Sequence, residues 1–175
     1  AYRTALELDP GFVPARVNLA ILFNDLERKD EAEAEYRKVI DLEPETFVLA
    51  EANYSLGLLA AENEQRLEEA AKYLGAARRL APERARFHYN YGLAMQHLGQ
   101  IAEAEEALKT ACRLSPRTVA FLHALAIFYA QQESWNNAKA CVEGLMRLDP
   151  ANPQWASTLE YYEQESQGTG KTKAD

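Results

Sequence analysis

Residues 91–116 read YGLAMQHLGQIAEAEEALKTACRLSP and contain one copy of the pattern that organises the whole chain. A large residue followed by a small one, Tyr91 and Gly92, comes 13 residues before Ala104, and Ala104 comes 12 residues before Pro116. The same order recurs on both sides of this stretch. The equivalent prolines are Pro10, Pro44, Pro82, Pro116 and Pro150, at steps of 34, 38, 34 and 34 residues. A fixed period in this range predicts a stacked array in which no unit buries its apolar face alone.

Each unit is expected to consist of two helices. Proline has no amide hydrogen and disfavours helix in the residue before it, so each of these prolines ends a helix. Between the prolines, apolar residues recur at three- to four-residue spacing, as at Val17, Leu19, Ala20 and Phe23, which is the helical period. Short polar stretches, such as residues 27–30, divide each unit in the middle. The sequence therefore predicts an all-α fold of helix–turn–helix units.

Small residues recur where the two helices of a unit must approach closely. A larger side chain there would hold the helices apart, and overpacking of this kind costs about 1–3 kcal/mol. These residues are Ala20, Gly57, Gly92 and Ala126 in the first helices and Ala32, Ala70, Ala104 and Ala138 in the second.

The pattern of Tyr91-Gly92, Met95, Ala104, Leu108, Ala111 and Pro116 resembles the tetratricopeptide repeat, and the resemblance extends over about residues 1–165. It implies a right-handed superhelical solenoid of antiparallel helix pairs. The predicted segments are the end of a preceding repeat (1–10), four repeats (13–46, 47–84, 85–118 and 119–152), a capping helix (153–165) and a disordered tail (166–175).

The second repeat is four residues longer than the others. Counted from the repeated markers, three of the added residues fall around Phe47, Val48 and Leu49, and one falls in the turn near Asn63. Two interpretations remain open. The insertion is either tolerated, with a local change of the superhelix, or it forms an apolar ledge that a partner contacts.

The two ends differ in what they predict. Residues 1–10 match the end of a second helix, so we expect a longer protein with a further repeat upstream. At the other end, Asn152 is a good N-cap and Pro153 suits the first helical position. Glu160 stands where the repeats have alanine or glycine, which indicates a polar capping helix on which no further repeat stacks.

Composition limits the classes of partner and the compartment. A formal net charge of −8 repels polyanions, so nucleic acid is not expected as a partner. No apolar run is long enough to insert into a membrane, which favours a soluble protein, cytoplasmic or exported with the parent chain. Cys112 and Cys141 are expected to be free thiols that fill small apolar spaces.

The sequence predicts no enzyme, no cofactor and no metal site. His88, His97 and His123 form no metal-binding motif, and no paired-cysteine motif is present. Gly170-Lys171-Thr172 resembles the end of a phosphate-binding loop, but Glu165 stands where that loop needs glycine. Carboxylate runs at 31–35 and 103–106 are expected to be solvated helix faces.

The resemblance implies a concave groove, lined by the first helices, that binds an extended peptide or a helix. The expected groove residues are Val17, Asn18, Ile21, Tyr54, Leu58, Arg86, Tyr89, Asn90, Leu93, His97, His123 and Ile127. Asn18 and Asn90 match asparagines that hold a peptide backbone in some members of the family. Arg86 and Asn90 alone do not make the clamp that binds chaperone C-terminal tails, so such a tail is not expected as the partner.

Three functions are compatible with these observations. The first is a protein–protein interaction module whose groove binds a peptide or helix with apolar side chains. The second is a non-catalytic docking or substrate-presenting arm of a larger enzyme or electron-transfer protein. The third is self-association, as a homodimer, through the apolar face of Ala1, Tyr2 and Ala5.

Overall fold

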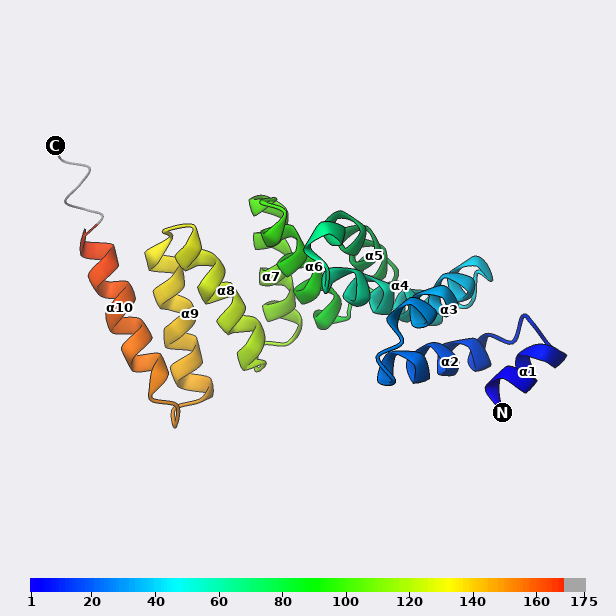
Figure 1. Cartoon of the computed structure of the whole chain (residues 1–175). Coiled ribbons are helices and arrows are strands. Elements are labelled where there is room, and N and C mark those ends of the chain that lie inside the picture. The colour runs from blue at the N-terminus through cyan, green and yellow to red at the C-terminus, as the bar shows by residue number, and fades with distance from the viewer. Residues whose placement is uncertain (169–175) are drawn as a thin grey trace.

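The computed structural model describes residues 1–168, which form a row of α-helices with no strand among the described residues (Figure 1). The helices are α1 (Tyr2–Leu8), α2 (Val13–Asp25), α3 (Lys29–Asp41), α4 (Thr46–Ala61), α5 (Leu67–Leu80), α6 (Ala85–His97), α7 (Ile101–Leu114), α8 (Val119–Gln131), α9 (Trp135–Leu148) and α10 (Gln154–Gly168). A short 3₁₀ helix, η1 (Glu64–Arg66), precedes α5. The predicted all-α fold is confirmed.

The helices pack as successive pairs: α2 with α3, α4 with α5, α6 with α7 and α8 with α9, followed by α10 against α9. Figure 1 shows them following one another in chain order, from α1 at one end of the row to α10 at the other. Contacts therefore join mainly neighbours in the sequence, as in other stacked repeat proteins.

The small residues lie at the closest approaches, as predicted. Ala20 and Ala126 are buried, and the four alanines of the second helices are completely buried. A Cβ added to Gly57 would lie only 2.6 Å from Cγ of Leu74, and one added to Gly92 would lie 2.9 Å from Cγ of Leu108. Glycine is therefore required by the distance between helices at both crossings.

Three of the turns inside the repeats share one backbone motif. Glu27, Gly99 and Glu133 have φ angles of 57°, 71° and 53°, in the left-handed region. The next residue then donates its N–H to a carbonyl five residues back, as in the 2.9 Å bond from Gln100 to Met95. This is the Schellman arrangement that commonly ends helices.

The second repeat differs in the two places that the residue counts predict. Helix α4 has 16 residues where α2, α6 and α8 have 13, and its additional residues lie at its N-terminal end. The turn after α4 contains η1, where the N–H of Gln65 donates to Oδ1 of Asn63 at 2.9 Å. The boundaries assigned to whole repeats stay predictions.

At the C-terminal end, α10 extends further than expected. Oδ1 of Asn152 accepts the N–H of Gln154 at 3.0 Å, and Trp155 and Tyr162 are buried while Glu160 is exposed. The prediction of a disordered tail from residue 166 is wrong for 166–168, which continue the helix because its first turns are anchored by these aromatic rings. The rest of that tail, 169–175, lies outside the described residues.

Two of the carboxylates expected in solvent are buried instead. Glu33 and Glu35 are 6% and 8% exposed. Glu33 accepts hydrogen bonds from Arg66 at 2.6 and 2.8 Å and from Arg37 at 3.0 Å, whereas Glu35 pairs with Arg16 at 2.8 Å. The prediction of a wholly solvated helix face fails because arginines from neighbouring helices cover these two side chains.

The two thiols are free, as predicted. Cys141 is buried and Cys112 is half-buried. Burial raises the pKa of each thiol to about 11, so both remain protonated and behave as apolar groups at neutral pH.

Candidate peptide-binding groove

Helices α2, α4, α6 and α8 line one face of the array, which we call the first-helix face. Two main hollows open along it, one on each side of a filled central region. The N-terminal hollow, about 280 Å³, is lined by Val17, Ile21, Tyr36, Phe47, Val48, Glu51, Ala52 and Ser55. The C-terminal hollow, about 350 Å³, is lined by Tyr89, Leu93, Gln96, His97, Ala120, His123, Ala124, Ile127 and Gln131.

The N-terminal hollow combines predicted groove residues with the insertion of the second repeat. Val17 and Ile21 come from α2, and Phe47 and Val48 come from the added turn of α4. Phe47 is 54% exposed, and the guanidinium of Arg84 lies 5.0 Å from its ring centroid. The insertion thus places an exposed apolar side chain on the first-helix face. This is the arrangement that the second interpretation, an apolar ledge, requires. A smaller adjacent hollow includes Leu58.

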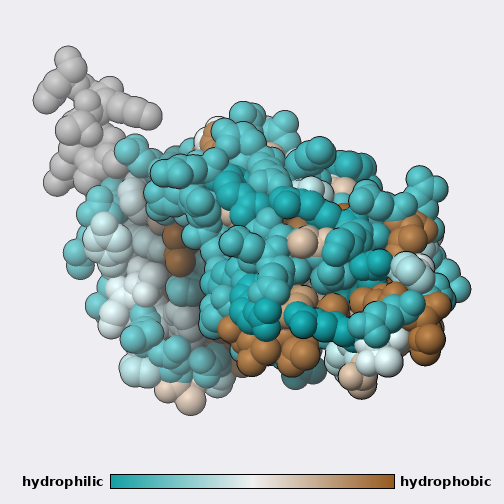
Figure 2. All heavy atoms as spheres, turned by 45° about the vertical axis from the view of Figure 1, so that its right-hand side comes forward, coloured by the Kyte–Doolittle hydropathy of each residue, from teal (hydrophilic) through white to brown (hydrophobic). Residues whose placement is uncertain are grey.

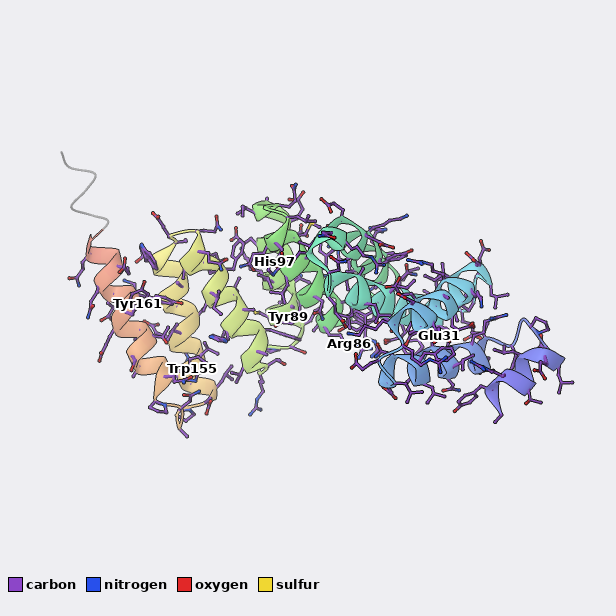
Figure 3. The ribbon with its side chains drawn as sticks, viewed as in Figure 1. Glu31, Arg86, Tyr89, His97, Trp155 and Tyr161 are labelled. Carbon is purple, nitrogen blue, oxygen red and sulfur yellow. The ribbon has the colours of Figure 1, made fainter. Side chains whose placement is uncertain are left out.

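The C-terminal hollow brings together five predicted residues from α6 and α8, Tyr89, Leu93, His97, His123 and Ile127. Figure 3 shows Tyr89 and His97 on α6, at the side that faces α8. Aromatic contacts fix its walls. The ring of Tyr89 lies 4.8 Å from that of Phe121, and the ring of His123 lies 5.1 Å from that of Trp155 in α10. The amide of Gln96 also donates to that of Gln131.

The centre of the face is filled by predicted groove residues that bind one another. Tyr54 of α4 packs on Phe87 of α6 with ring centroids 4.6 Å apart. Nδ2 of Asn90 donates to Oη of Tyr54 at 2.8 Å and to the carbonyl of Arg86 at 3.0 Å. A bidentate grip on a peptide backbone by Asn90 would therefore require one of these bonds to break. Asn18, in contrast, is exposed.

Arg86 also has an internal partner, which the sequence does not predict. Its Nη2 lies 2.5 Å from both carboxylate oxygens of Glu51, one repeat earlier. Its guanidinium lies 4.9 Å from the ring centroid of Tyr54 and 5.3 Å from that of Phe87. Burial raises the pKa of the Tyr54 phenol, which remains protonated beside this cation.

Carboxylates are nearly absent from the helices that line this face, a signal that sequence reasoning missed. Asp25 and Glu51 are the only carboxylates in α2, α4, α6 and α8, whereas α3, α5, α7 and α9 contain eleven. The four first helices carry no net charge, and the net charge of −8 comes mainly from the turns and α10, because ten lysines and arginines nearly balance the carboxylates of the second helices. This distribution of carboxylates can be read from the sequence once the repeat pattern has assigned the first and second helices.

Other surfaces offer less definite chemistry. A hollow of about 620 Å³ lies over α7 and mixes charges of both signs with Cys112 and Leu125. No group of three or more histidine, cysteine or acidic side chains within residues 1–168 could hold a metal ion. Over the same residues, no helix is both long and apolar enough to cross a membrane.

Models of the tetratricopeptide repeat match residues 13–46 and 54–119, on either side of the insertion in α4. The chain belongs to the tetratricopeptide-repeat family. Three solved structures share its right-handed superhelical solenoid. YrrB, described as a TPR protein with an unusual peptide-binding site, is 20% identical with a TM-score of 0.80, over 95% of this chain and 84% of that one. MamA from Desulfovibrio magneticus RS-1 is 22% identical with a TM-score of 0.73, over 87% and 84%.

The third structure is pilF of Pseudomonas aeruginosa, 22% identical with a TM-score of 0.72, over 98% of this chain and 86% of that one. At these identities the likeness establishes the fold alone. Two curated relatives from Drosophila melanogaster are much longer. Protein O-mannosyl-transferase Tmtc3 is 27% identical over 83% of this chain, and Tmtc2 is 34% identical over 51%. The chain spans only 15% and 10% of their lengths.

The tetratricopeptide-repeat fold is generally a non-catalytic scaffold for interactions between proteins. The family and fold therefore support a protein–protein interaction module.

Proposed function

We propose that the first-helix face binds a peptide or helix of a partner protein through apolar side chains. The observation that carries this proposal is the pair of hollows lined by predicted groove residues. Ile21, Leu58 and Ile127 line or adjoin them and keep 44%, 37% and 38% of their surfaces exposed. Exposed apolar patches commonly mark interaction sites. The peptide-binding site ascribed to YrrB, which shares the fold, is consistent with the proposal.

The size of the hollows limits what can occupy them. Volumes of about 280 and 350 Å³ accommodate one large side chain each. Burying such a side chain contributes about 1.5–3 kcal/mol. Together with backbone contacts along the face, two such side chains are compatible with micromolar affinity, about −8 kcal/mol.

A matched pair of variants tests this proposal. Leu58→Glu/Ile127→Glu places two charges on the first-helix face, and Ile101→Glu/Leu114→Glu places two charges on α7, where the replaced residues are 38% and 39% exposed. Both variants should keep the helical circular dichroism of the parent. Proteins captured from a lysate and identified by mass spectrometry should disappear with the first variant and persist with the second. Identical capture by all three proteins would contradict binding at this face.

A second candidate function is favoured by the curated relatives. The chain matches 15% of Tmtc3 and 10% of Tmtc2, both named as transferases. A tetratricopeptide array that forms a small part of a large enzyme would serve as a non-catalytic docking or substrate-presenting arm. Sequencing the transcript beyond both ends of this segment tests the idea. A reading frame that encodes only further repeats would count against it.

Self-association through the N-terminal end is a third candidate. Tyr2, Leu8 and Phe12 are 41%, 85% and 45% exposed. Figure 2, in which the α1 end of the molecule is turned forward, shows hydrophobic surface along the lower edge of the view. Sedimentation equilibrium of the parent and of Leu8→Glu/Phe12→Glu tests the homodimer. A monomer at high concentration would rule it out.

A further inference from the structure

Arg86 lies between the two hollows, and some of its N–H donors are not used in hydrogen bonds. Its side chain is 48% exposed, and its ion pair with Glu51 involves Nη2 alone. Within residues 1–168, Nε and Nη1 of Arg86 have no hydrogen-bond partner. A guanidinium has five N–H donors and binds a carboxylate best through two parallel N–H bonds from different nitrogens. Glu51 uses one nitrogen, so the stronger mode of pairing remains available.

The position of this cation is fixed from beneath. The guanidinium lies over the rings of Tyr54 and Phe87, which themselves pack together, and Asn90 holds both the Tyr54 hydroxyl and the Arg86 carbonyl. Arginine over an aromatic face is an energetically favourable arrangement. The cation therefore stays at the centre of the face when its carboxylate partner changes.

The charge of the surrounding face selects the kind of partner group. Glu51 is the only carboxylate in α4, α6 and α8, so its displacement would leave Arg86 with no carboxylate on these helices to pair with. The turns and α10 carry most of the net negative charge of the chain and would repel an acidic segment there. An acidic side chain of a partner is therefore complementary to this one position.

We propose that Glu51 occupies the place of a partner's carboxylate. The partner segment carries an internal aspartate or glutamate between two bulky apolar side chains, and this rests on the proposed function of the first-helix face. The acidic group displaces Glu51 from Arg86, while the apolar groups enter the two hollows. The carboxylate is a side chain rather than a chain terminus, because the segment must continue past Arg86 in both directions to reach both hollows.

The geometry also limits the spacing within the segment. Taking the spacing of packed helices, about 8–10 Å, for each step between first helices places the two hollows about 16–20 Å apart. An extended chain advances about 3.3 Å per residue, which places the two apolar residues about five or six positions apart. The acidic residue lies near the middle.

Selection from random dodecapeptides displayed on phage tests the proposal. The C-termini of these peptides are joined to the coat protein, so no free terminal carboxylate is present. Peptides enriched on the parent chain should carry an acidic residue flanked by bulky apolar residues. The same selection is made on Glu51→Gln, on Arg86→Gln, and on the charge-matched control Arg113→Gln, which lies on α7.

Enriched sequences are then synthesised as amidated peptides and their binding is measured by fluorescence anisotropy. Changing the acidic residue of the peptide to its amide should weaken binding to the parent and to Arg113→Gln about tenfold, because one charged hydrogen-bonded pair is lost. The same change should have no effect on Arg86→Gln. Glu51→Gln should bind the acidic peptide several-fold more tightly than the parent does. The two proteins should bind the amide peptide with equal affinity.

The contrary results separate this inference from the proposed function. Enrichment of peptides without acidic residues, lost with Leu58→Glu/Ile127→Glu, would overturn the inference and support the groove. Acidic preference that survives in Arg86→Gln would overturn it as well, as would binding that requires a free C-terminal carboxylate in a second library. If no peptide is enriched on any of the folded proteins, both proposals fail.

Discussion

The second and third repeats build the same helix crossing from different lengths of chain. In α4 and α5, Gly57 lies against Leu74, and in α6 and α7, Gly92 lies against Leu108. Both leucines are almost completely buried, at 1% and 0% exposed. In the third repeat, three residues with Gly99 in the left-handed conformation join the two helices, whereas the second repeat has a longer turn that contains η1.

The difference shows which parts of a repeat are constrained. The four additional residues of the second repeat lie at the start of α4 and in the turn before α5, away from the crossing. They add contacts that the third repeat does not have. Phe47 lines the N-terminal hollow, and Arg66 binds Glu33 of the preceding repeat, where the third repeat has Gln100 before its second helix.

The largest effect should come from the leucines at the crossings. Leu74→Ala and Leu108→Ala each remove a buried side chain and should each destabilise the chain by about 2–5 kcal/mol. Urea denaturation followed by circular dichroism measures both. Similar losses would support equivalence of the two crossings, and a small loss at Leu74 alone would show that the insertion loosens its repeat.

A smaller effect is expected at the glycines, and here the two repeats should differ. Gly57→Ala places a methyl group 2.6 Å from Cγ and 3.0 Å from the backbone nitrogen of Leu74, and should cost about 1–3 kcal/mol. Gly92→Ala meets Leu108 at 2.9 and 3.2 Å, and the helix propensity of alanine, about 1 kcal/mol better than glycine, offsets more of its cost.

The double variant Gly57→Ala/Leu74→Ala checks the mechanism, since the smaller residue at 74 leaves room for the new methyl group. Its cost in unfolding free energy should be less than the sum of the two single costs. Additive losses would mean that the glycine is needed for another reason.

The next effect concerns the ion pairs that only the longer turn makes possible. Arg66→Gln should cost about 1–2 kcal/mol, because it leaves the buried Glu33 with Arg37 alone. Hydrogen bonding from Arg66, and next from Arg37, lowers the pKa of the Glu69 carboxyl. A carboxyl with a lowered pKa in the folded state contributes stability above its ordinary pKa, about 4.3, and loses it as pH falls through the lower value.

Unfolding free energies measured in urea at neutral pH and at successively lower pH values test this linkage. The parent chain should lose more stability below about pH 4 than Arg66→Gln does. Gln100→Ala, at the equivalent position of the third repeat, should leave the pH dependence unchanged. Parallel curves for the parent and Arg66→Gln would refute the contribution of Glu69.

The smallest effect should come from the exposed aromatic residue of the insertion. Phe47→Ser removes a side chain that is 54% exposed, and its effect on stability should stay within about 0.5 kcal/mol. A thermal melt measures the change. A loss above about 2 kcal/mol, typical of core truncation, would show that Phe47 is a structural residue instead of part of a binding surface.

The sequence periodicity predicted the features that are set within a single helix or turn, such as where residues are inserted and which face of a helix a residue lies on. Marker counts located the added residues near Phe47 and Asn63, because the crossings fix the markers on both sides. Period also placed Leu93 and Ile127 on a common face, where they line one hollow. The left-handed turns at Glu27 and Glu133 carry no such signal, since glutamate rarely adopts that conformation.

Contacts between repeats were beyond the reach of the sequence. Glu51 and Arg86 are 35 residues apart, and their pairing depends on the offset between α4 and α6 and on the rotamers of two long side chains. The burial of Glu33 likewise requires Arg66, 33 residues later. One hint was available, since carboxylates are nearly absent from the first helices.

The longer repeat lies near the middle of the row, with α1 to α3 on one side and α6 to α10 on the other (Figure 1). The curvature of a solenoid is the sum of small rotations from one repeat to the next. A small change of angle at the step between α4 and α6 therefore rotates the helices on either side, and the resulting displacement is largest at the two ends of the row. Residues at both ends of the molecule, far from the step, would therefore move the most when its angle changes.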